Sequence, residues 1–413
     1  MATLRRRLVA AVAVTSVGDG LVLAAFPLLA LRATHSALLI SGVAVASRLP
    51  WLLVSLYSGA LVDRSNRSRL VATVDLARAL LVAGVAVWAL NGTVPIAAIY
   101  VAAFLVGVGE TAVSAAMRAT VPEIAPGDEL VATNGRVGAA QTAGTRFLGP
   151  ATGGVVFSVS RAIPFFGDAL SYMGSAALLS SAIPADARRA QRRETSVWAD
   201  VRTGLRFFLA SRGLRILSVV VSSFAFCQAM VLAVLVLFAS SKLHLGATGY
   251  GVLLTVAGVG DVLAGLLARR IFRLIGSYAM IIVAGVAAAG GYVLLSSTSD
   301  RVVAAIALAL EAAATSLGNV ATLSTRQRLI PRERYGLVNN AFRMPITGLI
   351  PAGALVGGLL VTAIGFRYTF LTAGGFQLAV LASMALPLRR VEPKSAPPEP
   401  AGLATEQSGV PST

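Results

Sequence analysis

The sequence predicts an all-α integral membrane protein with twelve transmembrane helices in two pseudo-symmetric six-helix bundles. Three observations lead to this fold class: the composition, the placement of arginine and an internal repeat. Of the 413 residues, 56% are hydrophobic and only 13% are charged, and the mean hydropathy is +0.79. Soluble domains carry about 25% charged residues, so most of the surface of this protein has to face something other than water.

Twelve apolar runs approach or exceed the length of about 20 residues that a helix needs to cross a bilayer. We place the helices at residues 8–31, 38–61, 70–90, 95–119, 133–159, 162–184, 214–240, 247–268, 277–297, 301–323, 337–363 and 366–388. The first run follows three arginines, as in a secretory signal peptide, but it is too long for the apolar region of one and further spans follow. We therefore expect residues 8–31 to be a retained first helix.

Positive charge alternates between the two sets of loops. One set has arginine-rich clusters at residues 5–7, 64–69, 188–212, 269–273, 326–334 and 389–394, whereas the other holds only Arg32, Arg161, Lys242, Arg301 and Arg367. Cytoplasmic loops carry the excess of Lys and Arg, so both termini are expected inside the cell, in its inner or plasma membrane. The net charge of +17 fits membrane edges and not a nucleic-acid partner.

The apolar runs and charge clusters divide the chain into four parts. We expect an N-terminal six-helix bundle at residues 1–184, a cytoplasmic linker at 185–212, a C-terminal six-helix bundle at 213–390 and a disordered cytoplasmic tail at 391–413. The linker is basic, and an amphipathic surface helix is expected around Val197–Phe208. The tail is rich in Pro, Ser and Glu, a composition typical of disordered segments.

The two halves of the chain repeat each other at an offset of 204 to 206 residues. The matching pairs are Gly59 with Gly265, Pro126 with Pro331, Asn134 with Asn339, Gly149 with Gly353, and Gly153 with Gly357. Each fifth helix therefore has a Gly-xxx-Gly step, and small residues at this spacing let helix backbones approach closely in lipid. A six-helix repeat is an architecture of transporters whose substrate site lies between the halves near the midplane.

The loop after the second predicted helix reads GALVDRSNRSR at Gly59–Arg69. It resembles the signature G-x-L-x-D-R-x-x-R of the major facilitator superfamily. The corresponding second-half loop, Gly265–Arg273, keeps the glycine and the basic residues but lacks the aspartate. The resemblance covers nearly the whole chain apart from the tail. It implies the twelve-helix fold and transport of a small molecule by alternating access.

The fifth helix carries GPATGG at Gly149–Gly154, with Gly149, Pro150, Gly153 and Gly154 in the positions of the superfamily's antiporter motif. This motif is found mostly in exporters, although Thr145 stands where its preceding glycine is usual. Three further stretches are similar to exporters of siderophores (enterobactin-type) and macrolides. They are Ser16–Asp19 with Pro27–Leu31, Leu49–Trp51, and Asn339–Arg343.

The first candidate functional group is Asp63 with Arg64 and Arg67. A carboxylate is favourable at a helix N-terminus, where N–H groups are unpaired. The resemblance implies that Asp63 lies near the start of the eleventh helix when the cytoplasmic side is closed, and Arg118 is a further partner. The alternative is a solvated loop whose charges only set the orientation.

Ionisable residues within the predicted spans form the second set of candidates. A charge at the centre of a membrane helix costs about 2.5–3.5 kcal/mol on insertion scales, so each needs a partner or water. Asp19, Arg48, Arg146 and Glu311 are expected near the midplane, and Glu110 closer to the cytoplasm. The resemblance puts the first, fourth and tenth helices around the cavity, so Asp19, Glu110 and Glu311 are candidates for proton coupling. The alternative is a buried ion pair, such as Asp19 with Arg48.

Three more charged residues in the spans are interpreted as structural. Asp75 and Arg78 lie three residues apart on one helix face and are expected to pair. Asp168 is expected near the outer end of the sixth helix, a peripheral position in this fold. Polar and aromatic residues that fit either packing or a mixed cavity are Trp51, Tyr57, Gln141, Phe224, Gln228, Asn319 and Phe342.

Several other functions lack their sequence signals. The chain has no G-x-x-x-x-G-K-[ST] segment, so direct use of ATP is not expected. Its single cysteine excludes an internal disulfide, and no metal site, cofactor or enzyme activity is expected. We expect a monomeric secondary transporter that exports a small, partly lipophilic molecule (a drug, siderophore or other natural product) in exchange for protons. The alternatives are a metabolite uptake symporter and a lipid flippase on the same scaffold.

Overall fold

A computed structural model describes residues 2–54, 65–125, 128–182, 197–331 and 334–390. This part of the chain is helical and contains no strand. Seven of its helices are long and apolar enough to cross a bilayer. The predicted all-α membrane fold is therefore confirmed, whereas the count of twelve spans stays a prediction. The predicted disordered tail and the loop residues Gly59, Asp63 and Arg64 lie outside the described residues.

In the described residues, the N-terminal bundle consists of six rods. They are α1 (Ala2–Ala33), α2 (Ala37–Leu53), α4 (Arg67–Asn91), α5 (Ile96–Ile124), a composite rod of α6 (Asp128–Thr142), η1 (Ala143–Leu148) and α7 (Gly149–Val159), and α8 (Ile163–Ala182). Side-chain caps fix where helices begin: Ser36 accepts the N–H of Leu39 at the start of α2, and Asn66 accepts that of Arg69 at the start of α4.

The C-terminal bundle contains two helices that are too long to cross a bilayer once. It consists of α10 (Arg212–Leu232), α11 (Leu235–Ser241), α12 (Ala247–Ser297), α13 (Arg301–Leu329) and α14 (Tyr335–Arg389), and α9 (Val197–Ala210) precedes it. The 51 residues of α12 would span about 77 Å as one straight helix, against about 30 Å of hydrocarbon. Gly276 (φ 75°) interrupts α12 and Gly365 (φ 78°) interrupts α14. Each break lies between two predicted spans, at a left-handed conformation that glycine adopts without strain.

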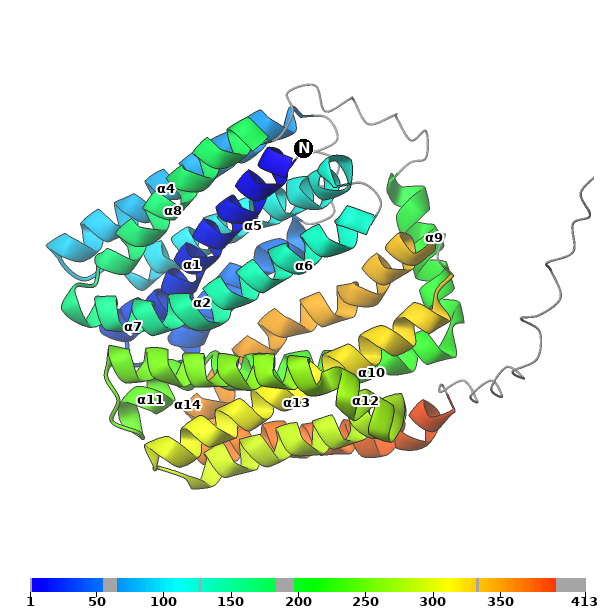
Figure 1. Cartoon of the computed structure of the whole chain (residues 1–413). Helices are drawn as coiled ribbons and strands as arrows, with labels where there is room; N and C mark the ends of the chain where they lie inside the picture. The colour runs from blue at the N-terminus through cyan, green and yellow to red at the C-terminus, as the bar shows by residue number, and fades with distance from the viewer. Residues whose placement is uncertain (1, 55–64, 126–127, 183–196, 332–333, 391–413) are drawn as a thin grey trace, which may run out of the picture.

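The helices form two groups that lie against each other (Figure 1). Helices α1 to α8 make one group and α10 to α14 the other, with α7 packed on α12 and α2 packed on α14. The helix ends that carry the arginine clusters, such as Arg5–Arg7, Arg67–Arg69 and Arg269–Arg273, are called the basic end below. At this end α9 runs across the bundle, transverse to the neighbouring helices (Figure 1).

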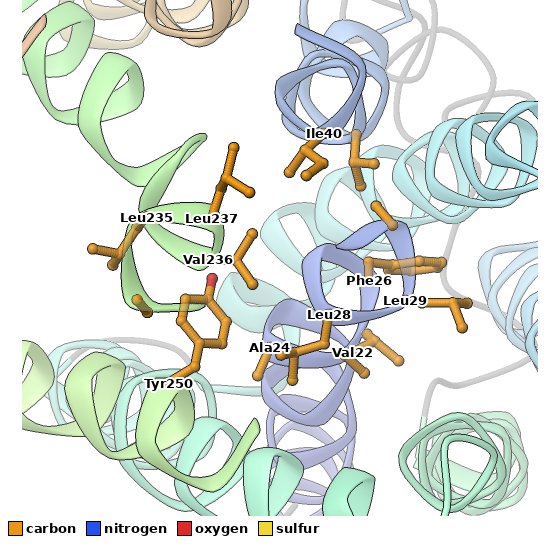
Figure 2. Packing of buried hydrophobic residues seen from close by; sticks show 14 of the residues in the cluster. Val22, Ala24, Phe26, Leu28, Leu29, Ile40, Leu235, Val236, Leu237 and Tyr250 are labelled. Carbon is orange, nitrogen blue, oxygen red and sulfur yellow. The ribbon is translucent and has the colours of Figure 1, made fainter. Parts of the chain in front are cut away.

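The largest cluster of buried apolar side chains joins the two groups (Figure 2). Val22, Phe26 and Leu28 of α1 and Ile40 of α2 lie in one cluster with Leu235–Leu237 of α11 and with Tyr250 of α12. All these residues are near the helix ends opposite the basic end. This end of the molecule is therefore sealed by apolar side chains from both bundles.

The predicted Gly-xxx-Gly steps make equivalent contacts in the two bundles. In the first, a Cβ added at Gly149 would collide with the backbone of Gly20 in α1. In the second, a Cβ at Gly353 or Gly357 would collide with backbone carbonyl oxygens of α10. The fifth helix of each half thus crosses the first helix of the same half at a distance that only glycine allows, as the internal repeat implies.

Candidate functional site

A group of buried charged residues lies between α1, α4 and α8, and the guanidinium of Arg78 is its centre. The Arg78 side chain on α4 is only 5% exposed. Its Nη1 donates to Asp75 Oδ1 at 3.3 Å, and its Nη2 donates to Asp19 Oδ1 at 3.2 Å and to the Tyr172 hydroxyl oxygen at 2.6 Å. One guanidinium therefore joins three helices of the N-terminal bundle.

Hydroxyl groups of α8 complete the coordination of the two carboxylates. The Tyr172 hydroxyl donates to Asp19 Oδ1 at 2.7 Å, and the Ser175 hydroxyl donates to Asp75 Oδ2 at 2.7 Å. The Asp75 side chain is fully buried, whereas that of Asp19 is 30% exposed. Asp19 is therefore the carboxylate of this pair that water can reach.

A third carboxyl group, Asp168 of α8, borders the same network. It is fully buried, its Oδ1 accepts a 3.2 Å hydrogen bond from Ser171, and its Oδ2 has no partner among the described residues. A Cβ at Gly18 of α1 would collide with both Ser171 and Asp168. Asp168 is therefore buried beneath α1, which passes close over it.

Two pairings were expected from the sequence, and the structure contains one of them. Asp75 and Arg78 form the expected ion pair, but Arg78 also holds Asp19. The suggested pair of Asp19 with Arg48 is wrong, since the Arg48 side chain is exposed and the described part of the chain has no such contact. The reason is helix packing: α8 contacts both α1 and α4, which brings Asp19 and Arg78 together across 59 residues of sequence.

Sequence reasoning missed Tyr172 and Ser175 altogether. With Asp168 and Ser171 they form a polar row at positions i, i+3, i+4 and i+7 of α8, which places all four on one helix face. A polar row of this spacing inside an apolar span would have indicated a buried partner on a neighbouring helix.

Glu110 of α5 is half-buried and accepts a hydrogen bond from α2. The indole Nε1 of Trp51 donates to Glu110 Oε2 at 3.5 Å, and Glu110 interacts electrostatically with Asp19. A Cβ at Gly107 would lie 2.7 Å from the Ser47 carbonyl oxygen, so α2 and α5 touch one turn away from Glu110. Glu110 and Asp19 are thus two carboxylates in the same region of the N-terminal bundle.

Glu311 is the buried carboxylate of the C-terminal bundle. Its side chain is 4% exposed, and its Oε1 accepts hydrogen bonds from Gln228 (3.2 Å), Tyr292 (3.1 Å) and Thr315 (2.9 Å). The donors come from α10, α12 and α13. Glu311 is therefore an acceptor for three neutral groups and joins three helices.

Replacing Glu311 by alanine is expected to destabilise the protein, because the buried Tyr292 and Thr315 and the partly buried Gln228 would lose their acceptor. An unsatisfied buried polar group costs about 1–3 kcal/mol, so we expect the free energy of unfolding to fall by at least about 2 kcal/mol. Glu311→Gln keeps an acceptor oxygen and should lose much less. Thermal denaturation of the purified variants in detergent measures the difference, and equal midpoints for the two variants would contradict this role of Glu311.

A cavity of about 280 Å³ lies between the two bundles. Six of its nine lining residues are polar or charged: the lining consists of Arg146 of η1, Gln228 of α10, Asp261 of α12, and Ala312, Thr315, Ser316, Asn319, Val320 and Leu323 of α13. The Nε of Arg146 lies 3.7 Å from Asp261 Oδ2, so an ion pair crosses from one bundle to the other inside this cavity. Both side chains are partly exposed, which leaves them accessible to a solute.

The π-helical segment η1 positions Arg146. Here the N–H of Gly149 bonds to the Gly144 carbonyl, five residues back, and Pro150 has no N–H to donate. A Cβ at Gly258 of α12 would collide with the Arg146 carbonyl oxygen. The main chain of Arg146 therefore touches α12 one turn away from the Asp261 that its side chain meets. Such π segments are frequent at functional sites.

The bundles also touch closely at the end opposite the basic end. A Cβ at Gly154 of α7 would lie 2.5 Å from the Ala247 carbonyl oxygen, and one at Gly251 of α12 would lie 2.5 Å from the Pro150 carbonyl oxygen. Gly358 of α14 packs equally closely on α2. These glycine contacts lie beside the apolar cluster of Figure 2 and close the same end.

Of the predicted loop group, the structure describes Arg67 and Arg118. Arg67 is buried at the start of α4 and its Nη1 lies 2.6 Å from Glu123 Oε1 of α5. Arg118 is exposed near the end of α5. The role of Asp63 stays a prediction. Among the described residues, no three His, Cys, Asp or Glu side chains come together as a metal site would require.

Comparison with known proteins identifies the family. Residues 3–404 match the transmembrane secretion effector family of the major facilitator superfamily. The chain belongs to this family. A segment of 92 residues is also 44% identical to the multidrug efflux pump Tap of Mycolicibacterium fortuitum. This segment covers 22% of this chain and 22% of that protein. The superfamily inferred from the signature loop is thus confirmed.

Three similar solved structures are transporters. The nucleoside transporter NupG has a TM-score of 0.71 at 13% identity, covering 94% of this chain and 98% of that chain. A bacterial homologue of the lysosomal transporter Spinster, inward-facing and unoccupied, has a TM-score of 0.70 at 14% identity, covering 95% and 98%. A bacterial homologue of the iron transporter ferroportin, inward-facing, has a TM-score of 0.70 at 15% identity, covering 93% and 99%. The protein is a multi-pass membrane transporter.

Proposed function

We propose that this transporter exports a small, partly lipophilic molecule, such as a drug, a siderophore or another natural product, from the cell in exchange for protons. The observation that carries the proposal is the buried network of Asp19, Asp75 and Asp168 around the single guanidinium of Arg78. The name of the partial relative Tap, a multidrug efflux pump, and the GPATGG segment of the fifth helix support export.

The orientation follows from the charge of the loops. With the basic end in the cytoplasm, as the excess of arginine favours, the end closed by the Gly154 and Gly251 contacts faces outward. The cavity around Arg146 and Asp261 would then load from the cytoplasm. This arrangement corresponds to the inward-facing state of an alternating-access cycle, in which the two bundles rock about the central site.

The charge balance of the network provides the proton site. Three carboxyl groups, two of them fully buried, lie around one guanidinium, and uncompensated charge is costly inside a membrane protein. Asp19 is the partly exposed member and so can exchange a proton with water. Protonation neutralises Asp19 and so removes its ion-pair attraction to Arg78. Since α1 also contacts η1 and α7, a weaker link between α1 and α4 would shift the balance between the two open states.

The test is transport by Asp19→Asn and Glu110→Gln in everted membrane vesicles with an imposed pH gradient and a panel of fluorescent drugs. We expect Asp19→Asn to abolish pH-driven accumulation while the amount of folded protein is unchanged. Asp300→Asn is the matched control, because Asp300 is an exposed cap at the start of α13 and asparagine caps a helix equally well.

Two outcomes would contradict the proposal. Unchanged pH-driven flux in both Asp19→Asn and Glu110→Gln would exclude proton coupling through these carboxylates. Accumulation of the same compounds in right-side-out vesicles, driven by a proton gradient directed inward, would instead indicate an uptake symporter.

A further inference from the structure

One face of α9 is docked on the C-terminal bundle. Gly204 and Phe208 are buried. A Cβ at Gly204 would lie 2.5 Å from the Leu337 carbonyl oxygen of α14, and the Phe208 ring meets the Phe342 ring edge-on with centroids 6.3 Å apart. The linker helix is therefore attached to the first turns of α14, at the basic end.

The remaining faces of α9 carry apolar and basic residues in separate rows. Leu205 and Leu209 are 37% and 52% exposed, and Arg202 and Arg206 are also exposed. At about 100° per residue, the leucines lie roughly 100–140° around the helix from Gly204 and the arginines roughly 160–200°. Leucine thus covers one flank and arginine the side opposite the docked face.

Two more exposed arginines, Arg212 and Arg215, follow at the start of α10. None of the four arginines forms an ion pair with a residue that the structure describes. Because α9 runs transverse to the spans at their basic end, it lies at the level where the bilayer surface is expected (Figure 1). A helix with an apolar flank beside a basic face is the type that lies in the membrane interface and is attracted to anionic lipids.

We propose that α9 binds the headgroups of anionic phospholipids through Arg202 and Arg206, with Leu205 and Leu209 in contact with the acyl chains. The charges are complementary, and the membrane supplies the ligand at this depth. Bound lipid would fix the position of α9 at the membrane surface. Through the contacts of Gly204 and Phe208 it would also fix the position of the first turns of α14. On its other side Phe342 is covered by the Arg326 guanidinium, 4.5 Å from the ring centroid, so the contact reaches α13 as well.

The first experiment measures lipid binding directly, without transport. The full chain is purified in detergent and titrated with phosphatidylglycerol, and bound lipid is counted by native mass spectrometry. We expect Arg202→Gln/Arg206→Gln to lower the affinity about tenfold to thirtyfold, since each arginine near an anionic surface contributes about 1 kcal/mol. The matched control is Arg161→Gln/Arg367→Gln, which removes the same charge from exposed residues at the end opposite the basic end and should bind almost as the unchanged protein does.

A second measurement tests whether α9 contacts the acyl chains, even if the double variant is poorly folded. Leu205→Cys in a Cys227→Ser background carries a nitroxide label in nanodiscs that contain phosphatidylglycerol. We expect the label to be reached by dissolved oxygen more readily than by a water-soluble nickel complex. Equal loss of lipid in both arginine pairs, or a label at Leu205 that the nickel complex reaches freely, would overturn the proposal.

Discussion

Arg78→Gln is expected to lower the free energy of unfolding by about 3–5 kcal/mol, because removing one partner of a buried ion pair leaves an uncompensated charge. In this protein the loss is shared by Asp19 and Asp75, which both accept hydrogen bonds from the guanidinium, and by the Tyr172 hydroxyl. Thermal denaturation in detergent and the yield of folded protein from membranes measure the effect.

Two further variants isolate the cause. Arg48→Gln removes an exposed arginine from α2 and should change the midpoint little. Combining Arg78→Gln with Asp75→Asn removes one of the stranded carboxylates and should restore part of the lost stability. An Arg78→Gln midpoint equal to that of Arg48→Gln would show that the network does not hold α1, α4 and α8 together.

Gly154→Leu is expected to abolish transport while leaving the protein folded. Gly154 faces Ala247 and Gly251 of the other bundle, so a larger side chain does not disturb the packing within its own bundle. It does prevent the two bundles from meeting at the end opposite the basic end. Transport by alternating access needs both ends to close in turn, so the variant should remain open at this end.

Spin labels report that opening without a transport assay. Val159 at the end of α7 and Lys242 after α11 are exposed at the closed end, one on each bundle. The distance between labels at these positions should lengthen by several ångströms, about the size of the added side chain. Gly84→Leu on α4 is the control, because a Cβ there meets nothing within 4 Å. If Gly154→Leu transports as well as Gly84→Leu, the prediction that this end must close during transport is wrong.

Features set by neighbouring residues were predictable from the sequence. The membrane class follows from the length of the apolar runs, and the pairing of Asp75 with Arg78 follows from helical spacing. The contact of Gly353 and Gly357 with α10 mirrors that of Gly149 with α1, as the repeat implied. In each case a pattern in the sequence is enough to predict the structure that forms in a bilayer.

Features that depend on which helices are neighbours were not predictable in the same way. The sequence suggested Arg48 as the partner of Asp19, whereas the packing of α8 against α1 and α4 brings Asp19 to Arg78. The π-helical segment before Pro150 also escaped prediction, because a proline in a span indicates a disturbed helix but not the form of the disturbance.

The sequence by itself determined that this protein is an all-α membrane transporter of the major facilitator superfamily, since apolar length, the repeat and a contiguous loop motif are properties of the linear chain. Only the tertiary structure decided where the charges meet. The contact of Tyr172 with Asp19 joins residues 153 positions apart, and Arg146 meets Asp261 across the two bundles. A buried charge is stabilised by the partner that helix packing brings within hydrogen-bond distance. The residues next to the charge in the sequence do not identify that partner.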